Sequence, residues 1–132
     1  MYSVKVDSRR ARNRIRKLIQ RIDTLPWREA GEIVKLSVKV NFVLGGSPKK
    51  WTPRKVDVPW PILRKTDKLM NSIYVNKLRN GVAVGSRKPY QAVHNFGFPP
   101  RNIPARKYLF AKKEDIVNIN KLFKKHLRMS RQ

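Results

Sequence analysis

The sequence contains no cysteine among its 132 residues. This absence excludes disulfide bonds and thiolate chemistry, and it suits synthesis in a reducing cytosol. No apolar stretch approaches the roughly 18 uninterrupted residues that a membrane helix needs, and the first six residues lack the apolar core of a signal peptide. We therefore expect a protein that neither spans a membrane nor carries a standard export signal.

Groups that move protons or hold metals are also scarce. The close acidic pairs, Glu29 with Glu32 and Glu114 with Asp115, fall at predicted helix starts, where the helix dipole accounts for them. A nuclease would use His94 as a base, but neither an acidic metal ligand nor a second base accompanies it. We predict no enzyme activity, no catalytic residue, no metal site and no cofactor.

The abundant feature is positive charge. The chain has 32 Lys plus Arg against 8 Asp plus Glu, a formal net charge of +24. An excess of this size repels itself in a compact monomer and attracts polyanions, without any preference for a nucleic acid sequence. Because 40% hydrophobic residues can supply one core but hardly two, we expect a single domain over residues 1–132 with basic extensions.

The first predicted element is a basic helix over residues 7–22, within an N-terminal segment of residues 1–24. Apolar residues recur there at spacings of four, three and four, which places Ala11, Ile15, Leu18 and Ile22 on one stripe. Asp7 or Ser8 can cap this helix. The candidate polyanion contacts on the helix are Arg9, Arg10, Arg12, Arg14, Arg16 and Lys17. The alternative is that these cations form only a solvated face.

The other patterns predict an α+β fold, with a small antiparallel sheet formed by a central hairpin and packed against N-terminal and C-terminal helices. The predicted elements are a helix over 26–44, a loop over 45–61, strands over 72–79 and 82–86 that turn at Asn80-Gly81, a short helix over 89–96 closed by Gly97, and a helix over 112–127. Residues 38–44 also suit a strand. The last helix and the basic tail add Lys124, Lys125 and Arg128 to the candidate polyanion contacts.

A series of short motifs follows the first helix. In chain order it reads Asn41-Phe42, Gly45-Gly46-Ser47-Pro48, Trp51-Thr52-Pro53, Ile62-Leu63, residues 69–73, Val84-Gly85-Ser86, Tyr90-Gln91-Ala92-Val93-His94-Asn95-Phe96-Gly97 and Ile103-Pro104-Ala105-Arg106-Lys107-Tyr108-Leu109. This series resembles the phage virion morphogenesis or tail completion proteins of Mu-like and P2-like phages. The resemblance covers roughly residues 30 to 127.

The resemblance implies a structural virion protein that acts late in assembly, in tail completion or head-tail joining. It implies a core over residues 25–127, a basic tail over 128–132, and a ring of identical subunits, six-fold by analogy, at the neck or the head-proximal end of the tail. The expected partners are other neck, connector or tail proteins, with genomic DNA as a further candidate and no membrane. The protein would lie in the virion and, during assembly, in the host cytoplasm.

Aromatic and proline-rich segments are the candidates for contacts with other subunits. These candidates are Trp51, Pro53, Trp60, Tyr90, His94, Phe96, Pro104, Arg106 and Tyr108. The two tryptophans can instead pack on their own domain. The main alternative function is that of a nonspecific nucleic-acid-binding protein of the ribosomal or nucleoid type, which the net charge supports.

Overall fold

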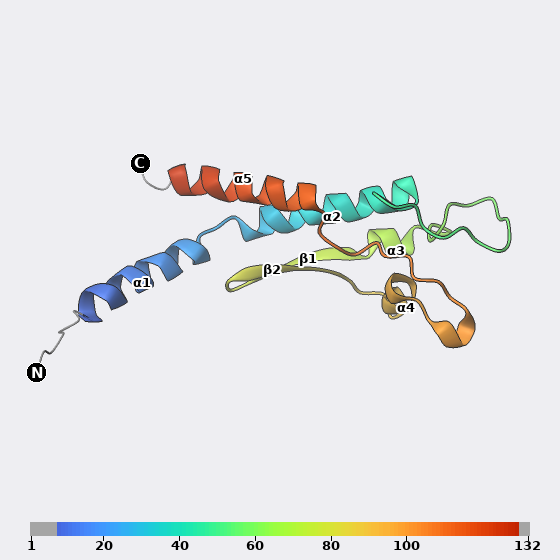
Figure 1. Ribbon diagram of the computed structural model, residues 1–132, viewed down its shortest axis with the longest axis horizontal. Coiled ribbons are helices and arrows are strands. Elements are labelled where there is room, and N and C mark those ends of the chain that lie inside the picture. Colours follow the sequence, from blue (N-terminus) through green and yellow to red (C-terminus); the bar gives the residue numbers. More distant parts are fainter. Residues whose placement is uncertain (1–7, 130–132) are drawn as a thin grey trace, which may run out of the picture.

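The computed structural model describes residues 8–129. Its elements are α1 (Ser8–Asp23), α2 (Trp27–Leu44), α3 (Lys68–Asn71), β1 (Ile73–Leu78), β2 (Gly81–Ser86), α4 (Gln91–Phe96), the short 3-10 helix η1 (Pro99–Arg101) and α5 (Lys113–Met129) (Figure 1). The predicted α+β class is confirmed. Two sequence predictions, the Asp7 cap and the part of the basic tail over 130–132, lie outside the described residues.

Helix α2 is the centre of the fold. It lies between the β1–β2 hairpin on one side and α5 on the other (Figure 1). Residues 38–44, which also suited a strand, continue the helix to Leu44. Gly45 ends it in the left-handed conformation at φ 70°, and the Gly46 N–H donates to the Asn41 carbonyl oxygen at 2.8 Å, as at many helix C-termini.

The hairpin turns one residue earlier than the sequence pattern predicts. Leu78 pairs with Gly81, so the turn residues are Arg79 and Asn80 instead of Asn80 and Gly81. The observed register sets Val75 opposite Val84, and a cross-strand pair of β-branched side chains stabilises an antiparallel sheet. This pairing accounts for the register better than the preference of Asn-Gly for a turn.

Close contact between α2 and the hairpin depends on Gly31. A Cβ atom at this position would lie 2.5 Å from Val75 Cγ1 and 2.7 Å from Val82 Cγ2, closer than real carbon atoms approach each other. Glycine therefore lets the hairpin lie directly against the helix backbone. Beyond this contact the core gathers around fully buried Phe42, whose ring meets Trp51 edge-on at 5.7 Å and the tilted ring of Tyr108 at 5.0 Å.

The outer helix α5 is held to α2 by a second aromatic contact, with Trp27 and Phe123 ring centroids 5.0 Å apart. Its first turn is closed by Asp115, whose carboxylate accepts the Lys112 backbone N–H at 2.9 Å. The C-terminal helix therefore packs on α2.

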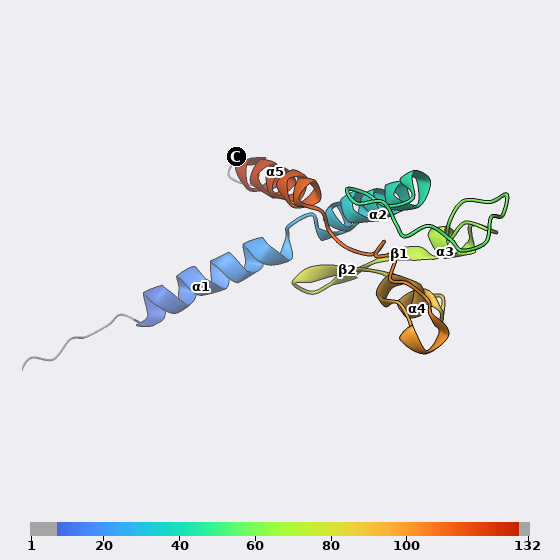
Figure 2. The same ribbon diagram turned by 45° about the vertical axis from the view of Figure 1, so that its right-hand side comes forward.

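Helix α1 leaves the body of the molecule and has no buried residue (Figures 1 and 2). The prediction that the N-terminal helix packs against the sheet is corrected, because α2 occupies that face. The joint between α1 and α2 holds the two helices apart. Trp27 Nε1 donates to the Ile22 carbonyl oxygen at 2.9 Å, Thr24 Oγ1 donates to the Arg21 carbonyl oxygen at 2.8 Å, and Pro26 restricts the residue before it to extended backbone.

Candidate functional site

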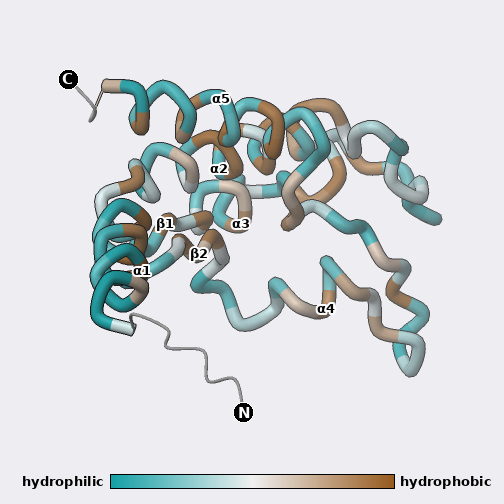
Figure 3. Tube along the Cα trace, turned by 60° about the vertical axis from the view of Figure 1, so that its left-hand side comes forward, coloured by the Kyte–Doolittle hydropathy of each residue, from teal (hydrophilic) through white to brown (hydrophobic). Residues whose placement is uncertain are grey.

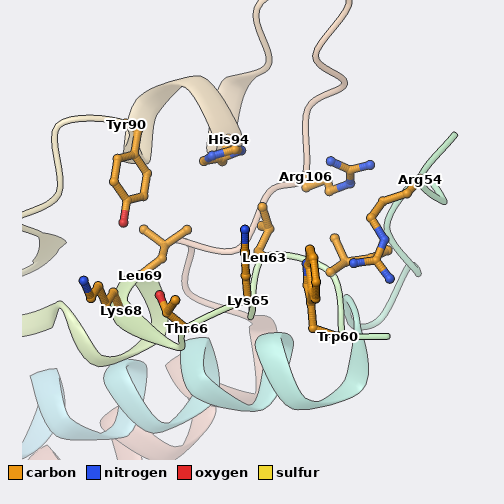
Figure 4. Close-up of a pocket in the computed structure, with 11 residues that line it drawn as sticks. Arg54, Trp60, Leu63, Lys65, Thr66, Lys68, Leu69, Tyr90, His94 and Arg106 are labelled. Atoms are coloured by element: carbon orange, nitrogen blue, oxygen red, sulfur yellow. The ribbon is translucent and has the colours of Figure 1, made fainter. Parts of the chain in front are cut away.

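A basic pocket of about 270 Å³ lies between α4 and the loop that joins α2 to α3 (Figure 4). Five of its lining side chains are cationic or imidazole groups, namely Arg54, Lys65, Lys68, His94 and Arg106. The remaining lining residues are Trp60, Ile62, Leu63, Thr66, Leu69 and Tyr90. No residue that lines the pocket is acidic, so its cations have no carboxylate beside them there.

Arg106 is the best-anchored cation of the basic pocket. Its side chain is 9% exposed, and Nε donates to the Thr52 carbonyl oxygen at 3.0 Å. Its backbone N–H donates to the His94 carbonyl oxygen at 2.9 Å. Burial lowers the pKa of Arg106, and the neighbouring Arg54 guanidinium lowers it further. Two cations thus stand close together in a partly dehydrated place, which an anion would stabilise.

A ladder of side-chain hydrogen bonds fixes the segment that carries Arg106. Asn95 Oδ1 accepts the backbone N–H groups of Tyr108 and Leu109, both at 3.1 Å. Asn41 Nδ2 donates to the Tyr108 carbonyl oxygen at 2.9 Å, and Trp51 Nε1 donates to the Lys107 carbonyl oxygen at 3.1 Å. Asn41 and Asn95 are buried, so these bonds hold the backbone beside Arg106 rigidly.

Tyr90, at the N-terminus of α4, and His94, within it, both line the pocket. Their ring centroids lie 5.8 Å apart in an edge-on arrangement. Burial lowers the pKa of the His94 imidazole, and the charge of Arg106 lowers it further, so both effects favour the neutral ring. His94 Nδ1 and one terminal nitrogen of Arg54 are buried without a hydrogen-bond partner among the described residues. Polar groups in this condition remain able to bind an incoming ligand.

The rim of the basic pocket adds further positive charge. Lys65 Nζ lies 4.9 Å from the centroid of the Trp60 ring, a cation–π contact that orients the lysine at the mouth. The nearest acidic residue along the chain, Asp67, is held by Arg64 at 2.8 Å, and this hydrogen bond lowers the pKa of Asp67. The arrangement can bind an anionic group through two guanidiniums and two ammonium groups.

The structure separates the predicted contact residues into three groups. Trp60, Tyr90, His94 and Arg106 come together in the basic pocket. Trp51 and Tyr108 are 8% and 0% exposed, so for these two aromatics the contact prediction is corrected: they close the core around Phe42. Phe96 is 73% exposed and Pro53 is exposed, whereas Pro104 is half-buried, and none of these three lines the pocket.

Sequence reasoning missed the other cations of the pocket, Arg54, Lys65 and Lys68. Among 32 Lys and Arg they carry no distinguishing pattern, and they reach the pocket only because the loop folds back on α4. The one local signal is that Arg54 directly follows the Trp51-Thr52-Pro53 motif, whose neighbours are fixed by buried hydrogen bonds.

The candidate polyanion contacts occupy a different part of the molecule. All nine of them are exposed: Arg9, Arg10, Arg12, Arg14, Arg16 and Lys17 on α1, and Lys124, Lys125 and Arg128 on α5. Figures 1 and 2 show that α1 and the C-terminal half of α5 lie at the end of the molecule away from α4, the helix that carries His94 into the basic pocket. The chain therefore has a basic end and, separately, a basic pocket.

No helix between residues 8 and 129 is both long enough and apolar enough to cross a membrane. Within the same residues, no group of three or more His, Asp or Glu side chains is placed to hold a metal ion.

The amino-acid sequence was compared with known protein families, proteins and structures. No solved structure matches the chain. Over 88 residues the chain is 34% identical to the Mu-like prophage FluMu G protein 2 of Haemophilus influenzae, a match that covers 63% of this chain and 62% of that relative's length. A model of the phage virion morphogenesis family matches residues 7–128, which is nearly the whole chain. The chain therefore belongs to the phage virion morphogenesis family.

Proposed function

We propose that this morphogenesis protein is a non-catalytic ring subunit, at the neck or the head-proximal end of the tail, that completes the tail or joins it to the head. It would be made in the host cytoplasm and end in the virion. Family membership supports a role in building the particle. The observation that supports the finer proposal is that nine exposed cations lie on α1 and α5, whereas four other cations line a separate pocket.

The basic end suits contact with a polyanion. The nine predicted contact residues, six on α1 and three on α5, offer many weak contacts without a defined geometry, which is how proteins hold the phosphate backbone. Identical subunits of +24 repel one another when they are stacked in a ring, and phosphates or acidic neighbours reduce this repulsion. Genomic DNA passing through the ring would supply those phosphates.

The basic pocket suits a protein partner. Its cations are few, and the Thr52 and His94 carbonyl oxygens hold Arg106 in place, so the pocket suits one anionic group and not a long charged surface. A carboxylate from a neighbouring connector or tail protein fits this arrangement. The six-fold symmetry that we favour for the ring comes from resemblance to the family alone.

The test is to localise the protein in assembled particles. Intact particles would be separated into heads, tails and joined necks on a gradient, and the chain quantified by mass spectrometry in each fraction. The proposal predicts a small ring-sized number of copies in tails or necks. If the chain is absent from particles and bound to ribosomes or bulk DNA, the nonspecific nucleic-acid-binding alternative replaces it.

A second arm of the test uses α1. Reversing the charges of Arg9, Arg12 and Arg16 together should reduce particle assembly and DNA retention if the basic end contacts DNA or acidic partners. Unchanged assembly and retention would remove the polyanion role and leave the pocket as the contact site.

A further inference from the structure

Helix α1 carries an apolar seam that nothing in the described chain covers. Ile15, Leu18, Ile19 and Ile22 are 56%, 56%, 44% and 42% exposed and recur along one side of the helix (Figure 3). An isolated helix of 16 residues is marginally stable in water, and amphipathic helices usually gain their stability by burying the apolar side. A covering surface is therefore expected for this seam.

Helix α2 carries an exposed stripe of the same kind on the side away from the hairpin. Leu36, Val40 and Val43 follow one another at spacings of four and three, and they are 65%, 38% and 64% exposed. A shallow groove of about 290 Å³ runs beside Leu36 and Val40 and reaches Glu114 at the start of α5. We call this surface, Leu36, Val40 and Val43 with the adjoining groove, the α2 face.

Charged residues border both surfaces. Helical spacing places Arg12 and Arg14 beside the seam of α1. The same spacing extends the α2 face towards its N-terminus through Glu29 and Glu32, both exposed. Among the described residues neither of these glutamates forms a salt bridge. In a chain with 8 acidic residues, Glu29, Glu32 and Glu114 give the α2 face carboxylates that the arginines of the seam can meet, and Lys39 and Lys112 border the same face.

The joint after α1 argues against docking within one chain. Folding α1 back onto its own α2 would break the bonds from the Trp27 indole to the Ile22 carbonyl and from Thr24 to the Arg21 carbonyl. Trp27 is also fixed by its contact with Phe123. The matching surface is therefore available on another copy and not on the same one.

We propose that α1 is an arm whose apolar seam docks on the α2 face of a second copy of this chain. The contact is head to tail, since each copy gives its arm to one neighbour and receives the arm of another. Contacts of this kind close into rings when the rotation between copies allows it. The inference rests on the proposed ring and adds the surfaces that build it.

Docking by the seam leaves the opposite side of α1 exposed. Arg9 and Lys17 lie on the side of α1 away from the seam and remain in solvent. One helix thus serves two purposes, with its apolar side on the neighbour and its basic side towards a polyanion. Substitutions on the two sides should therefore have separable effects.

Cysteine cross-linking tests the arm directly, because the natural chain has no cysteine. The double variant Leu18→Cys with Val40→Cys, oxidised in solution, should give a ladder of disulfide-linked oligomers. Mixing the two single variants should give linked dimers only. The matched control is Asn13→Cys with Val40→Cys, which places the arm cysteine opposite the seam and should abolish the ladder.

Each outcome decides between named arrangements. A single linked species that runs as a compact monomer would mean that α1 folds back on its own α2, and this overturns the arm. The mass of the natural chain, measured by light scattering, separates the two proposals. If the natural chain is an oligomer and Leu18→Asp leaves its mass unchanged, the arm is overturned and the ring is kept. If the natural chain is a monomer and the double cysteine variant gives no ladder, both proposals are overturned.

Discussion

The body of the molecule and its first helix use the same amino acids in different ways. In the body, over residues 27–129, apolar rings close on Phe42 and polar groups such as Asn41 and Asn95 find buried partners. In α1, every residue from 8 to 22 is exposed, including four large apolar ones. The body is thus determined by its own packing, whereas α1 is suited to partners outside the chain.

Positive charge shows the same division. On α1 the arginines point into solvent, where each exposed charge adds little to stability but contributes to long-range attraction. In the basic pocket, Arg106 and Arg54 stand near each other, and the pKa of Arg106 is lowered by burial first and by Arg54 second. In a chain with so many cations, the few that are buried and hydrogen-bonded, such as Arg106, cannot be recognised from the net charge.

The largest expected difference concerns the core. Phe42→Ala removes the ring at the centre of the buried cluster and should lower the free energy of unfolding by about 3–5 kcal/mol. Leu18→Ala on α1, measured in dilute protein, should change it by about 0.5 kcal/mol or less because the side chain is exposed. Urea unfolding followed by circular dichroism compares the two. Equal losses would show that α1 is packed within the monomer.

The next effect tests the contact between α2 and the hairpin. Gly31→Ala adds a Cβ against Val75 and Val82, and the overpacking should cost about 1–3 kcal/mol, reduced by the better helix propensity of alanine. Gly81→Ala is the control, because nothing lies within 4 Å of its Cβ position and its φ is not positive. Thermal unfolding should show a lower midpoint for Gly31→Ala alone. A neutral result at both positions would mean that the hairpin shifts away at no cost.

The third effect separates the basic end from the basic pocket in DNA binding. Neutralising Arg9, Arg16 and Lys17 with glutamine should lower the dependence of log Kd on log salt, by about 0.9 for each phosphate that the variant no longer neutralises. Arg54→Gln in the pocket should leave that slope unchanged. Fluorescence anisotropy with duplex DNA across a salt series measures both. A slope that falls only with Arg54→Gln would reverse the assignment of the two regions.

The smallest expected effect is a dependence of folding stability on pH, which arises from His94 in the body of the molecule. Because the pKa of His94 is lowered in the fold, the unfolded chain takes up a proton at a pH where the folded chain does not. Stability should therefore fall as the pH drops below about 6.5, by at most about 1.4 kcal/mol per pH unit, until the folded pKa is reached. His94→Gln should flatten this part of the profile. Added inorganic phosphate should also flatten it if the pocket binds anions, since an anion favours protonated His94.

The long helices could be predicted from the sequence because their apolar spacing is local information. The stripe Ala11, Ile15, Leu18 and Ile22 indicates α1 without any knowledge of the fold, and α2 and α5 follow in the same way. The preference of Asn80-Gly81 for a turn places the hairpin one residue too late, because the register depends on pairing Val75 with Val84 across the sheet. Helix α3, with 4 residues, is too short for periodicity to reveal it.

The basic pocket could be predicted only in part. The motif residues Tyr90, His94 and Arg106 indicate a special region, but their meeting with Arg54 depends on bonds between distant segments, such as Arg106 to Thr52. Composition also could not separate Trp60, which lines the pocket, from Trp51, which is buried in the core. Long-range hydrogen bonding makes this distinction, and a single sequence does not show it.

The joint at residues 24–26 has a consequence for symmetry. If arms link the copies, the angle between α1 and α2 sets how far each copy is rotated from the one before it, and this angle is held by the Trp27 indole and the Thr24 hydroxyl. Adding one residue to α1 would turn its seam by about 100° relative to the body. The number of subunits in the closed assembly would then be encoded in three residues, Thr24, Leu25 and Pro26, that belong to neither helix.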